Sequence, residues 1–553
     1  MNRKLLSTVC LGLLLAGCTM IPQAAAQAAP QPAGQAAGQA AVPRRVGPAE
    51  PISDKEYDLL LKGGHVIDTK NNLDAIRDVA IKDGKIAKVA VGIPASSAIK
   101  TVNVAGLYVA PGLIDMHVHV FWGLLEKSYD GGDWSIAPDG FTLHEGVTTI
   151  VDAGSSGWRN FAEFKERVID RSQTRVLAML NIVGGGMGNG PLEQNTADMD
   201  GKLTGEMALK YPGVIVGIKS AHFTGPEWKP YDQGLIAGTM AHVPLMIDYG
   251  SRRIERPLYQ LLEEKLRPGD IYTHMYMGGR GEQDSTTGGP GKGMWEGRQR
   301  GIYFDVGHGG ASFNFSVAVP LIKAGFIPDS ISTDIHSDNV NAGMRDMLTT
   351  GDKFLAMGLS LKEVIADMTW HPAVEIQQTQ LGNLSEGAIA DIAVLGVQHG
   401  DFGLVDGSGA LMKAHEKMEC ELTIKGGRFV YDLNGRSSSL WDGPPNPAAR
   451  QANKWTALRV TGFGGAPRPV QQTAAGQAQI AAQAQAVAAN GQQRPARWQP
   501  YETDANGNTT VKANAKLTPA GTAKTAAPKV PPPAAMWATP PAASWPPRQQ
   551  PQP

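Results

Sequence analysis

The chain has 553 residues, of which 42% are hydrophobic, and its formal net charge at pH 7 is -1. A chain of this length can bury a large core, and without a basic excess it lacks the electrostatic footprint of a nucleic-acid-binding protein. A small neutral or anionic substrate therefore suits it better than a polymer of phosphates.

The N-terminus has the pattern of a bacterial export signal. Two basic residues precede an apolar run at residues 5–15, which is too short to span a bilayer as a stable helix and is typical of a secretory signal. The run closes on Leu-Ala-Gly-Cys18, which resembles a lipobox. Residues 1–18 are therefore predicted to be a signal peptide, and the mature protein to be periplasmic and anchored to the membrane through lipid on Cys18. The alternative is an ordinary signal peptide cut later, near Ala28.

Two segments are too poor in large aliphatic side chains to build a core. Residues 19–51 consist mostly of Ala, Gln, Pro and Gly, and residues 442–553 are rich in Pro, Ala and Gln. Such compositions do not offset the entropy lost on ordering the chain. The first segment is predicted to be a disordered tether and the second a disordered tail.

Residues 52–107 have the pattern of a small β-sheet. Short apolar or alternating runs, for example at residues 57–61 and 86–89, are separated by glycine pairs and by Asp83-Gly84, a hairpin signal. Residues 388–436 repeat this pattern with similar turns. The two segments are predicted to form one composite β-sandwich from the two ends of the ordered chain.

Between these flanks, residues 108–387 alternate apolar strands with helical stretches. The clearest helical stretches are residues 158–172, 257–266 and 361–368. A long alternation of strands and helices is what a (β/α)8 barrel requires. The predicted fold class is α/β, a TIM barrel with the β-sandwich at its flank.

The most informative stretch opens the predicted barrel. An apolar run ends in His117 and His119, and because side chains alternate along a strand, both imidazoles point to one face as a chelating pair. Further along, polar side chains close apolar runs where barrel strands should finish. These residues are Lys219, His274, His308 and Asp334. Ligands on successive strand ends converge at one mouth of a barrel, so a metal site is predicted there.

Several motifs, in this order, resemble the amidohydrolase superfamily and, more narrowly, its amidohydrolase/deacetylase (dihydroorotase-like) branch. The likeness covers about residues 56–433. The motifs are residues 110–119, 146–154, 217–219, 273–274, 305–309 and 332–334. The resemblance implies a metal-dependent barrel with a flanking β-sandwich, which agrees with the fold predicted from the pattern.

The resemblance also implies a ligand set for two divalent cations, with zinc expected first and manganese or iron as alternatives. His117, His119 and Asp334 would hold one cation, and His274 would bind the second. Burial and nearby cations disfavour an ammonium group, so Lys219 is expected to be a neutral amine that takes up carbon dioxide. The resulting carbamate would bridge the two cations. The alternative for Lys219 is a lysine paired with a carboxylate.

The predicted fifth strand departs from the family. Asp248 stands where related chains usually have histidine. It is a candidate oxygen ligand, which would shift the second site toward manganese or iron. His222 and His308 are alternative donors of the missing imidazole, and a third alternative is catalysis with a single metal.

The implied reaction is hydrolysis by a metal-activated hydroxide. Asp334 is expected to accept the proton of the attacking water and to return it to the leaving group. His308 is expected to donate to a substrate carbonyl or carboxylate. Three further residues are predicted to contact the substrate: His222, Gly186 in the glycine-rich loop 184–190, and Arg280.

The favoured function is a metal-dependent hydrolase of an amide or ester bond in a small acylated substrate such as an N-acyl amino acid. The first alternative is a cyclic amidase of the dihydroorotase or hydantoinase type. The second is a non-catalytic binding lipoprotein on the same barrel. An inert barrel has no packing need for so many polar strand ends, which favours the enzyme. A small-molecule substrate and a homo-oligomer are the expected partners, with no nucleic acid and no membrane contact beyond the lipid anchor.

Overall fold

The computed structural model describes residues 54–121, 134–187, 192–438, 440, 501–503 and 509–511. The predicted signal peptide, Cys18 and the tether lie outside these residues, as does most of the predicted tail. Within that tail the structure describes one antiparallel pair, β16 (Tyr501–Thr503) and β17 (Thr509–Val511). None of the described helices is both long and apolar enough to cross a membrane.

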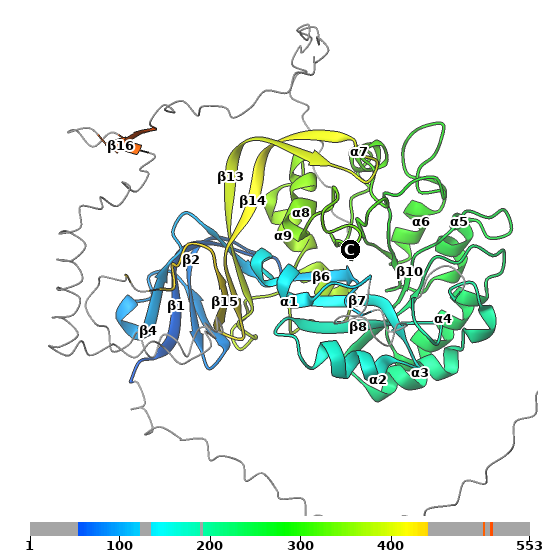
Figure 1. Ribbon diagram of the computed structural model, residues 1–553, viewed down its shortest axis with the longest axis horizontal. Coiled ribbons are helices and arrows are strands. Elements are labelled where there is room, and N and C mark those ends of the chain that lie inside the picture. Colours follow the sequence, from blue (N-terminus) through cyan, green and yellow to red (C-terminus); the bar gives the residue numbers. More distant parts are fainter. Residues whose placement is uncertain are drawn as a thin grey trace, which may run out of the picture. The chain divides into compact units, whose positions relative to one another are not determined.

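The first sheet draws its strands from both ends of the described chain (Figure 1). Its order is β15-β14-β13-β5-β1-β2-β3, and β4 also pairs with β1. The strands are β1 (Tyr57–Asp68), β2 (Leu73–Lys82), β3 (Lys85–Ala90), β4 (Ala98–Asn103), β5 (Tyr108–Pro111), β13 (Ile392–Val405), β14 (Leu411–Lys425) and β15 (Arg428–Asp432). The two segments join where β13 pairs antiparallel with β5. The strands of both predicted flanks thus belong to one eight-stranded sheet.

The predicted hairpin at Asp83-Gly84 is confirmed between β2 and β3. Asp83 has φ 50° and Gly84 has φ 75°. A two-residue turn with both central residues in the left-handed region matches the twist of the strands that it joins.

The second sheet is parallel throughout, with the order β12-β11-β10-β9-β8-β7-β6. Its strands are β6 (Leu113–Val118), β7 (Val147–Gly157), β8 (Arg175–Asn181), β9 (Ile215–Ser220), β10 (Leu245–Ile247), β11 (Ile271–Tyr272) and β12 (Tyr303–Phe304). Every residue of β6, β7 and β9 is buried, as expected for a parallel sheet that is covered on both faces.

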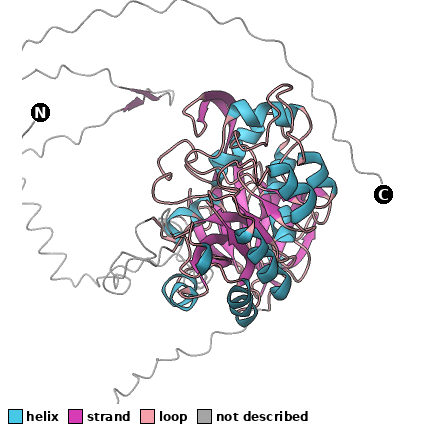
Figure 2. Ribbon diagram, turned by 90° about the vertical axis from the view of Figure 1, so that its right-hand side faces the viewer, coloured by secondary structure: helices cyan, strands magenta, loops and turns pink. Residues whose placement is uncertain are grey.

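The parallel sheet curls back on itself. Beyond β12, Asp305 forms an isolated parallel bridge with Ser330, and beyond β6, Val118 forms one with Ile335. The short segment from residue 330 to residue 335 therefore approaches both edges of the sheet. Figure 2 shows the strands at the centre of the described domain with helices on the outside.

Helices alternate with the parallel strands and occupy all three stretches predicted from the sequence. The α-helices are α1 (Pro138–Phe141), α2 (Phe161–Phe164), α3 (Gly201–Lys210), α4 (Lys229–Ala241), α5 (Leu258–Gln260), α6 (Met294–Gln299), α7 (Phe315–Lys323), α8 (Met347–Ala356), α9 (Leu361–Asp367) and α10 (Trp370–Glu375). Short 3-10 and π segments are η1 (Ala95–Ser97), η2 (Leu143–Glu145), η3 (Lys165–Ile169), η4 (Thr196–Asp198) and η5 (Leu261–Lys265).

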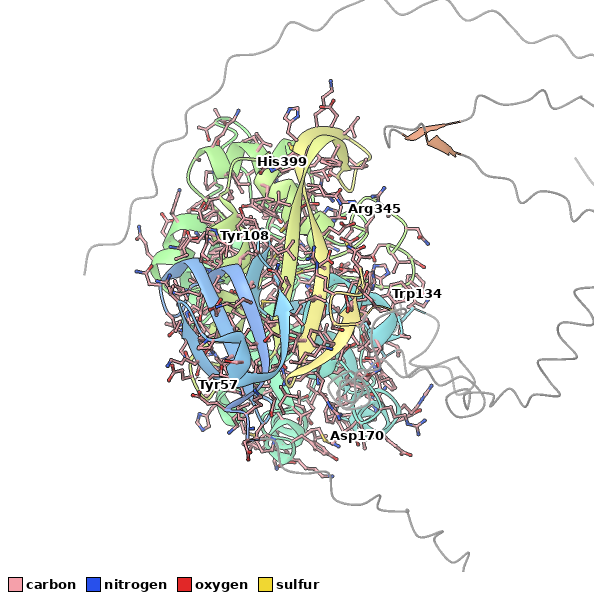
Figure 3. The ribbon with its side chains drawn as sticks, turned by 90° about the vertical axis from the view of Figure 1, so that its left-hand side faces the viewer. Tyr57, Tyr108, Trp134, Asp170, Arg345 and His399 are labelled. Atoms are coloured by element: carbon pink, nitrogen blue, oxygen red, sulfur yellow. The ribbon has the colours of Figure 1, made fainter. Side chains whose placement is uncertain are left out.

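Strands β13 and β14 extend beyond their sheet as a long hairpin, and His399 lies on the part that projects furthest (Figure 3). The hairpin is tied to α8 by Asp352, whose Oδ1 accepts a hydrogen bond from the backbone N–H of Met418 at 2.8 Å. The other oxygen, Oδ2, has no hydrogen-bond partner among the described residues. Because the side chain is fully buried, desolvation raises the pKa of Asp352 to about 7.

This buried carboxyl predicts a pH-dependent stability. The unfolded chain loses the proton near pH 4 and the folded chain near pH 7, so the stability contributed by this group is present below about pH 4 and is lost as pH rises through about 7. The variant Asp352→Asn keeps the acceptor for Met418. We expect its free energy of unfolding, relative to wild type, to increase by up to about 4 kcal/mol between pH 4 and pH 8.

Urea unfolding at several pH values measures this difference. Asp401→Asn is the control, because it removes a carboxylate that is 99% exposed on the same hairpin. A difference between Asp352→Asn and wild type that stays constant with pH would contradict the prediction.

Candidate metal centre

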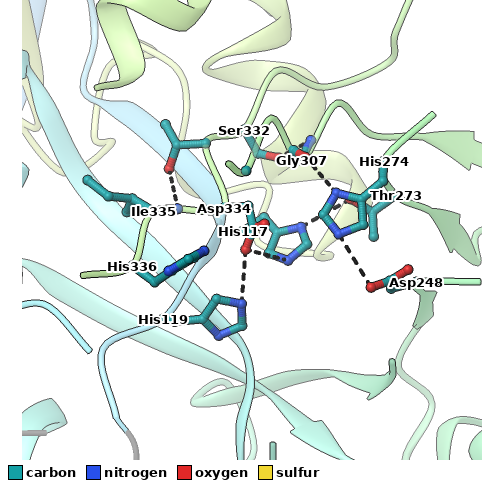
Figure 4. Close-up of polar contacts among 12 residues, drawn as sticks. His117, His119, Asp248, Thr273, His274, Gly307, Ser332, Asp334, Ile335 and His336 are labelled. Atoms are coloured by element: carbon teal, nitrogen blue, oxygen red, sulfur yellow. Dashed lines mark hydrogen bonds and ion pairs between the residues drawn. The ribbon is translucent and has the colours of Figure 1, made fainter. Parts of the chain in front are cut away.

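His117 and His119 leave the end of β6 on one face, as the two-residue spacing predicts. Both are buried, and their Nε2 atoms lie 3.5 and 3.0 Å from Oδ1 of Asp334. Figure 4 shows the three side chains converging. Among the described residues they form a group whose ligand atoms all lie within 4.8 Å of one another. Two imidazole nitrogens and one carboxylate oxygen fit a divalent cation such as zinc.

The outer nitrogen of each imidazole is also bonded. Nδ1 of His117 lies 3.0 Å from Oγ1 of Thr273, and Nδ1 of His119 lies 2.8 Å from Oγ of Ser155. These contacts hold both rings with Nε2 toward Asp334, the arrangement that orients metal-binding histidines. Burial, together with Lys219, lowers the pKa of His117 to about 3. The ring is therefore neutral, as a ligand must be.

Asp334 is held by its backbone as well as by its partners. Its φ of 53° lies in the left-handed region, which aspartate tolerates better than most residues. The backbone N–H of Asp334 donates to the carbonyl of His117 at 2.7 Å, and the side-chain amide of Asn339 donates to the carbonyl of Asp334 at 2.6 Å. Burial alone would raise the pKa of Asp334, but His117 and His119 hold it far below its usual range, so the carboxylate is ionised.

Lys219 reaches the same place from the end of β9. Its Nζ lies 3.0 Å from Nε2 of His117, and the residue is 1% exposed. Burial lowers the pKa of the amine, and no carboxylate of the described residues lies within ion-pair distance of it. The side chain of Lys219 also packs closely against β7. Position 154 of that strand must be glycine, because a Cβ atom there would stand 2.7 Å from Cβ of Lys219.

A second cluster lies around Asp248, at the end of β10. Its Oδ2 is 3.5 Å from Nε2 of His274 and 3.0 Å from Nε2 of His222, while its Oδ1 is 3.0 Å from Nη1 of Arg280. Burial alone would raise the pKa of Asp248, but His274 and His222 keep it well below its usual range. The predicted residues Asp248, His222 and His274 are thus brought together.

Arg280 lies behind this cluster and does not line the cavity. Its guanidinium donates to Glu282 at 2.6 Å, to Asp248, and to the backbone carbonyl of His274 at 2.9 Å. Burial disfavours the charged form, but Tyr272 and Glu282 raise its pKa overall. In this arrangement Arg280 orients Asp248, and its hydrogen bonds go to protein groups.

His308 is not brought to the cavity either. The residue is fully buried, its ring stacks on Phe313 at a centroid distance of 4.6 Å, and its Nε2 lies 2.5 Å from Nζ of Lys353. Nδ1 contacts the carbonyl of Gly309 at 2.8 Å. Both ring nitrogens are thus used inside the core, which separates His308 from the predicted contact with substrate or metal.

Glycine at position 186 is explained by the backbone conformation and not by contact with the cavity. Its φ is 83°, and a Cβ atom there would stand 2.2 Å from the carbonyl oxygen of Ser155. Glycine is needed because the loop crosses β7 at close range. The next residue, Met187, is the one that lines the cavity.

These clusters share the wall of one cavity of about 280 Å³. Its lining residues are His117, His119, Trp134, Met187, Glu193, Lys219, His222, Asp248, His274, Asp334 and His336. Sequence reasoning missed Trp134, Met187, Glu193 and His336. His336 stands two residues after Asp334, and this proximity to a predicted site residue is the signal that the sequence carries for it. Met187 belongs to the glycine-rich loop 184–190, whose Gly186 was predicted to contact the substrate, whereas Trp134 and Glu193 carry no comparable signal.

Comparisons with known proteins identify relatives of this chain. No protein-family model matches the chain. A deacetylase of Brucella anthropi is 32% identical over 370 residues, which are 65% of this chain and 88% of the relative. A deacetylase of Enterococcus faecalis is 33% identical over 391 residues, which are 68% of this chain and 100% of the relative.

Two solved structures are similar in fold and sequence. A crystal structure of an adenine deaminase has a TM-score of 0.62 and 31% identity, covering 68% of this chain and 100% of that chain. A crystal structure of a dihydroorotase has a TM-score of 0.57 and 29% identity, covering 68% of this chain and 99% of that chain. With these relatives and a His-His-Asp group at its cavity, the chain belongs to the amidohydrolase superfamily, as a metal-dependent amidohydrolase related to the deacetylases.

Proposed function

We propose that this hydrolase removes the acyl group from a small N-acyl amino acid or a related ester, using two divalent cations. The observation that carries the proposal is the convergence of His117, His119 and Asp334 on a cavity that Lys219 and His274 also line. The relatives support a hydrolase of carbon–nitrogen bonds rather than a non-catalytic binding lipoprotein.

His117, His119 and Asp334 would hold the first cation. His274, Asp248 and a carbamate on Lys219 would hold the second. Nitrogen and oxygen donors of this kind suit zinc, with manganese or iron as alternatives. When bound, a divalent cation lowers the pKa of a water molecule and polarises the carbonyl group of the bond to be cleaved.

The protein's own groups would move the proton. Asp334 is ionised and faces the cavity, so it can accept a proton from the attacking water and return it to the leaving nitrogen or oxygen. His336 lines the same cavity, and its Nδ1 accepts the backbone N–H of Asp338 at 3.3 Å. Its Nε2 is then the protonated nitrogen and can donate to a substrate oxygen.

The volume and the lining of the cavity suit a small substrate. A volume of about 280 Å³ leaves room for a small molecule. Trp134 and Met187 provide an apolar surface for an acyl chain or a side chain. Cyclic amide hydrolysis is the second candidate, because the dihydroorotase structure shares 29% identity over 99% of its length.

The proposal also includes a closed barrel, a flanking β-sandwich and export of the protein. A closed (β/α)8 barrel is supported by the bridges of Ser330 and Ile335 to the two edges of the parallel sheet. A flanking β-sandwich is supported by the sheet that both ends of the chain share. Export to the periplasm and lipid attachment at Cys18 are supported by the apolar run and the Leu-Ala-Gly-Cys segment.

Loss of Asp334 as a proton acceptor should abolish most of the activity. We expect Asp334→Asn to lower kcat/KM for an N-acyl amino acid by about 100- to 10,000-fold, because the amide cannot accept the proton. Assays of acyl release with Asp401→Asn as the control measure this effect. Retention of wild-type kcat/KM by Asp334→Asn would refute the assigned role.

Removing the cations should lower both stability and activity. Dialysis against a chelator is expected to lower the Tm and abolish turnover, and added zinc to restore both. A cation at 1,000 times its Kd stabilises the folded state by about 4 kcal/mol. Calorimetry before and after chelation measures the shift, and an unchanged Tm would count against a structural contribution of the cations.

Attachment of lipid at Cys18 should decide where the protein fractionates. We expect wild type in the membrane pellet and Cys18→Ser in the soluble fraction, because a serine cannot carry the thioether-linked lipid. Immunoblots of fractionated cells are the measurement. Wild type and Cys18→Ser in the same fraction would contradict the anchor.

A further inference from the structure

His222 lies between two buried carboxylates at the cavity wall. Its Nδ1 is 3.0 Å from Oε2 of Glu193, and its Nε2 is 3.0 Å from Oδ2 of Asp248. The side chains of these carboxylates are 3% and 5% exposed, whereas that of His222 is 50% exposed. The imidazole is therefore the open member of the three, and it lines the cavity.

The same oxygen of Asp248 has a second imidazole beside it. Nε2 of His274 lies 3.5 Å from Oδ2 (Figure 4). The other oxygen, Oδ1, is taken by Arg280 at 3.0 Å. Two imidazole nitrogens therefore approach one carboxylate oxygen, the same donor types as in the group of His117, His119 and Asp334.

The outer nitrogens of both imidazoles are already engaged. Nδ1 of His222 donates to Glu193, and Nδ1 of His274 donates to the carbonyl of Gly307 at 2.5 Å. A donor bond at Nδ1 fixes the ring so that Nε2 is the nitrogen that would face a cation beside Asp248. A carboxylate behind a metal-binding histidine is a recurrent support for metal binding. His336 has the opposite pattern, since its Nδ1 accepts a backbone N–H.

The position of His222 in the fold places its side chain beside Asp248. β10 ends at Ile247 and is followed directly by Asp248, so the fifth strand of the parallel sheet provides no imidazole. His222 follows β9, which pairs directly with β10. Its φ of 54° turns the chain immediately after the strand, and the side chain reaches Asp248.

We propose that His222 is a ligand of the second cation, together with His274 and Asp248, and that Glu193 is its orienting carboxylate. The inference rests on the proposed function, because it presupposes that cations bind at this cavity. It assigns to the loop after β9 the imidazole that β10 does not provide. Among the described residues only the first donor set lies within 4.8 Å throughout, so we expect the second cation to bind more weakly.

The test compares two histidines in the same backbone conformation. His222 has φ 54° and His242, which follows α4, has φ 57°. Asparagine tolerates this left-handed conformation, so His222→Asn and the control His242→Asn both preserve it. Each full-length protein is equilibrated with zinc and its metal content per chain is measured by plasma emission. The visible spectrum is then recorded after replacement by cobalt.

We expect two equivalents of zinc in wild type and His242→Asn, and one in His222→Asn, with a changed cobalt spectrum. Glu193→Gln should weaken the second cation about 10- to 100-fold, and it provides the same test if His222→Asn does not fold. Two equivalents and a wild-type cobalt spectrum in both His222→Asn and Glu193→Gln would overturn the inference and leave the proposed function intact. One equivalent in wild type would overturn it together with the two-cation part of the proposed function, while no zinc in wild type would refute metal-dependent hydrolysis at this cavity.

Discussion

Burial of ionisable side chains is the constraint on which the rest of this structure depends. Imidazoles, carboxylates and an amine gather in a protein interior, where each costs free energy unless it is paired and hydrogen-bonded. Hydrogen bonds to neighbouring groups offset this cost. His117 has Thr273, His119 has Ser155, and His274 has the carbonyl of Gly307. A cation at the centre would compensate the remaining negative charge of Asp334 and Asp248.

The supporting network extends behind the cavity to the segment that carries Asp334. Asp305 accepts hydrogen bonds from Thr273 and Ser332 at 2.6 and 2.7 Å. Asp115 accepts the hydroxyl of Thr333 at 2.5 Å. Because the last segment forms only isolated bridges with its neighbouring strands, these side chains take over the positioning that a longer strand ladder would provide. The left-handed backbone of Asp334 is held in this way.

His308 and Arg280 show how far the order of polar residues can guide a functional interpretation. Both follow strands of the parallel sheet in sequence, as Asp248 and His274 do. His308 turns into the core against Phe313 and Lys353, and Arg280 lies behind Asp248. Position along the chain therefore predicted the edge of the sheet at which the cavity lies, but the direction of each side chain separated the residues that line the cavity from those behind it.

Local periodicity was enough for the sequence by itself to determine the alternation of strands and helices, the hairpin at Asp83 and the convergence of His117 and His119 on one face. The order of polar strand ends likewise predicted the family, which the deacetylase relatives support, and it predicted a metal site among side chains that line the cavity. Only the tertiary structure decided that His222, Glu193 and Asp248 meet, because they come from separate loops and strands and no spacing relates them. It also decided which side chains line the cavity, since side-chain direction depends on backbone conformation and on the packing of neighbouring elements rather than on position in the chain.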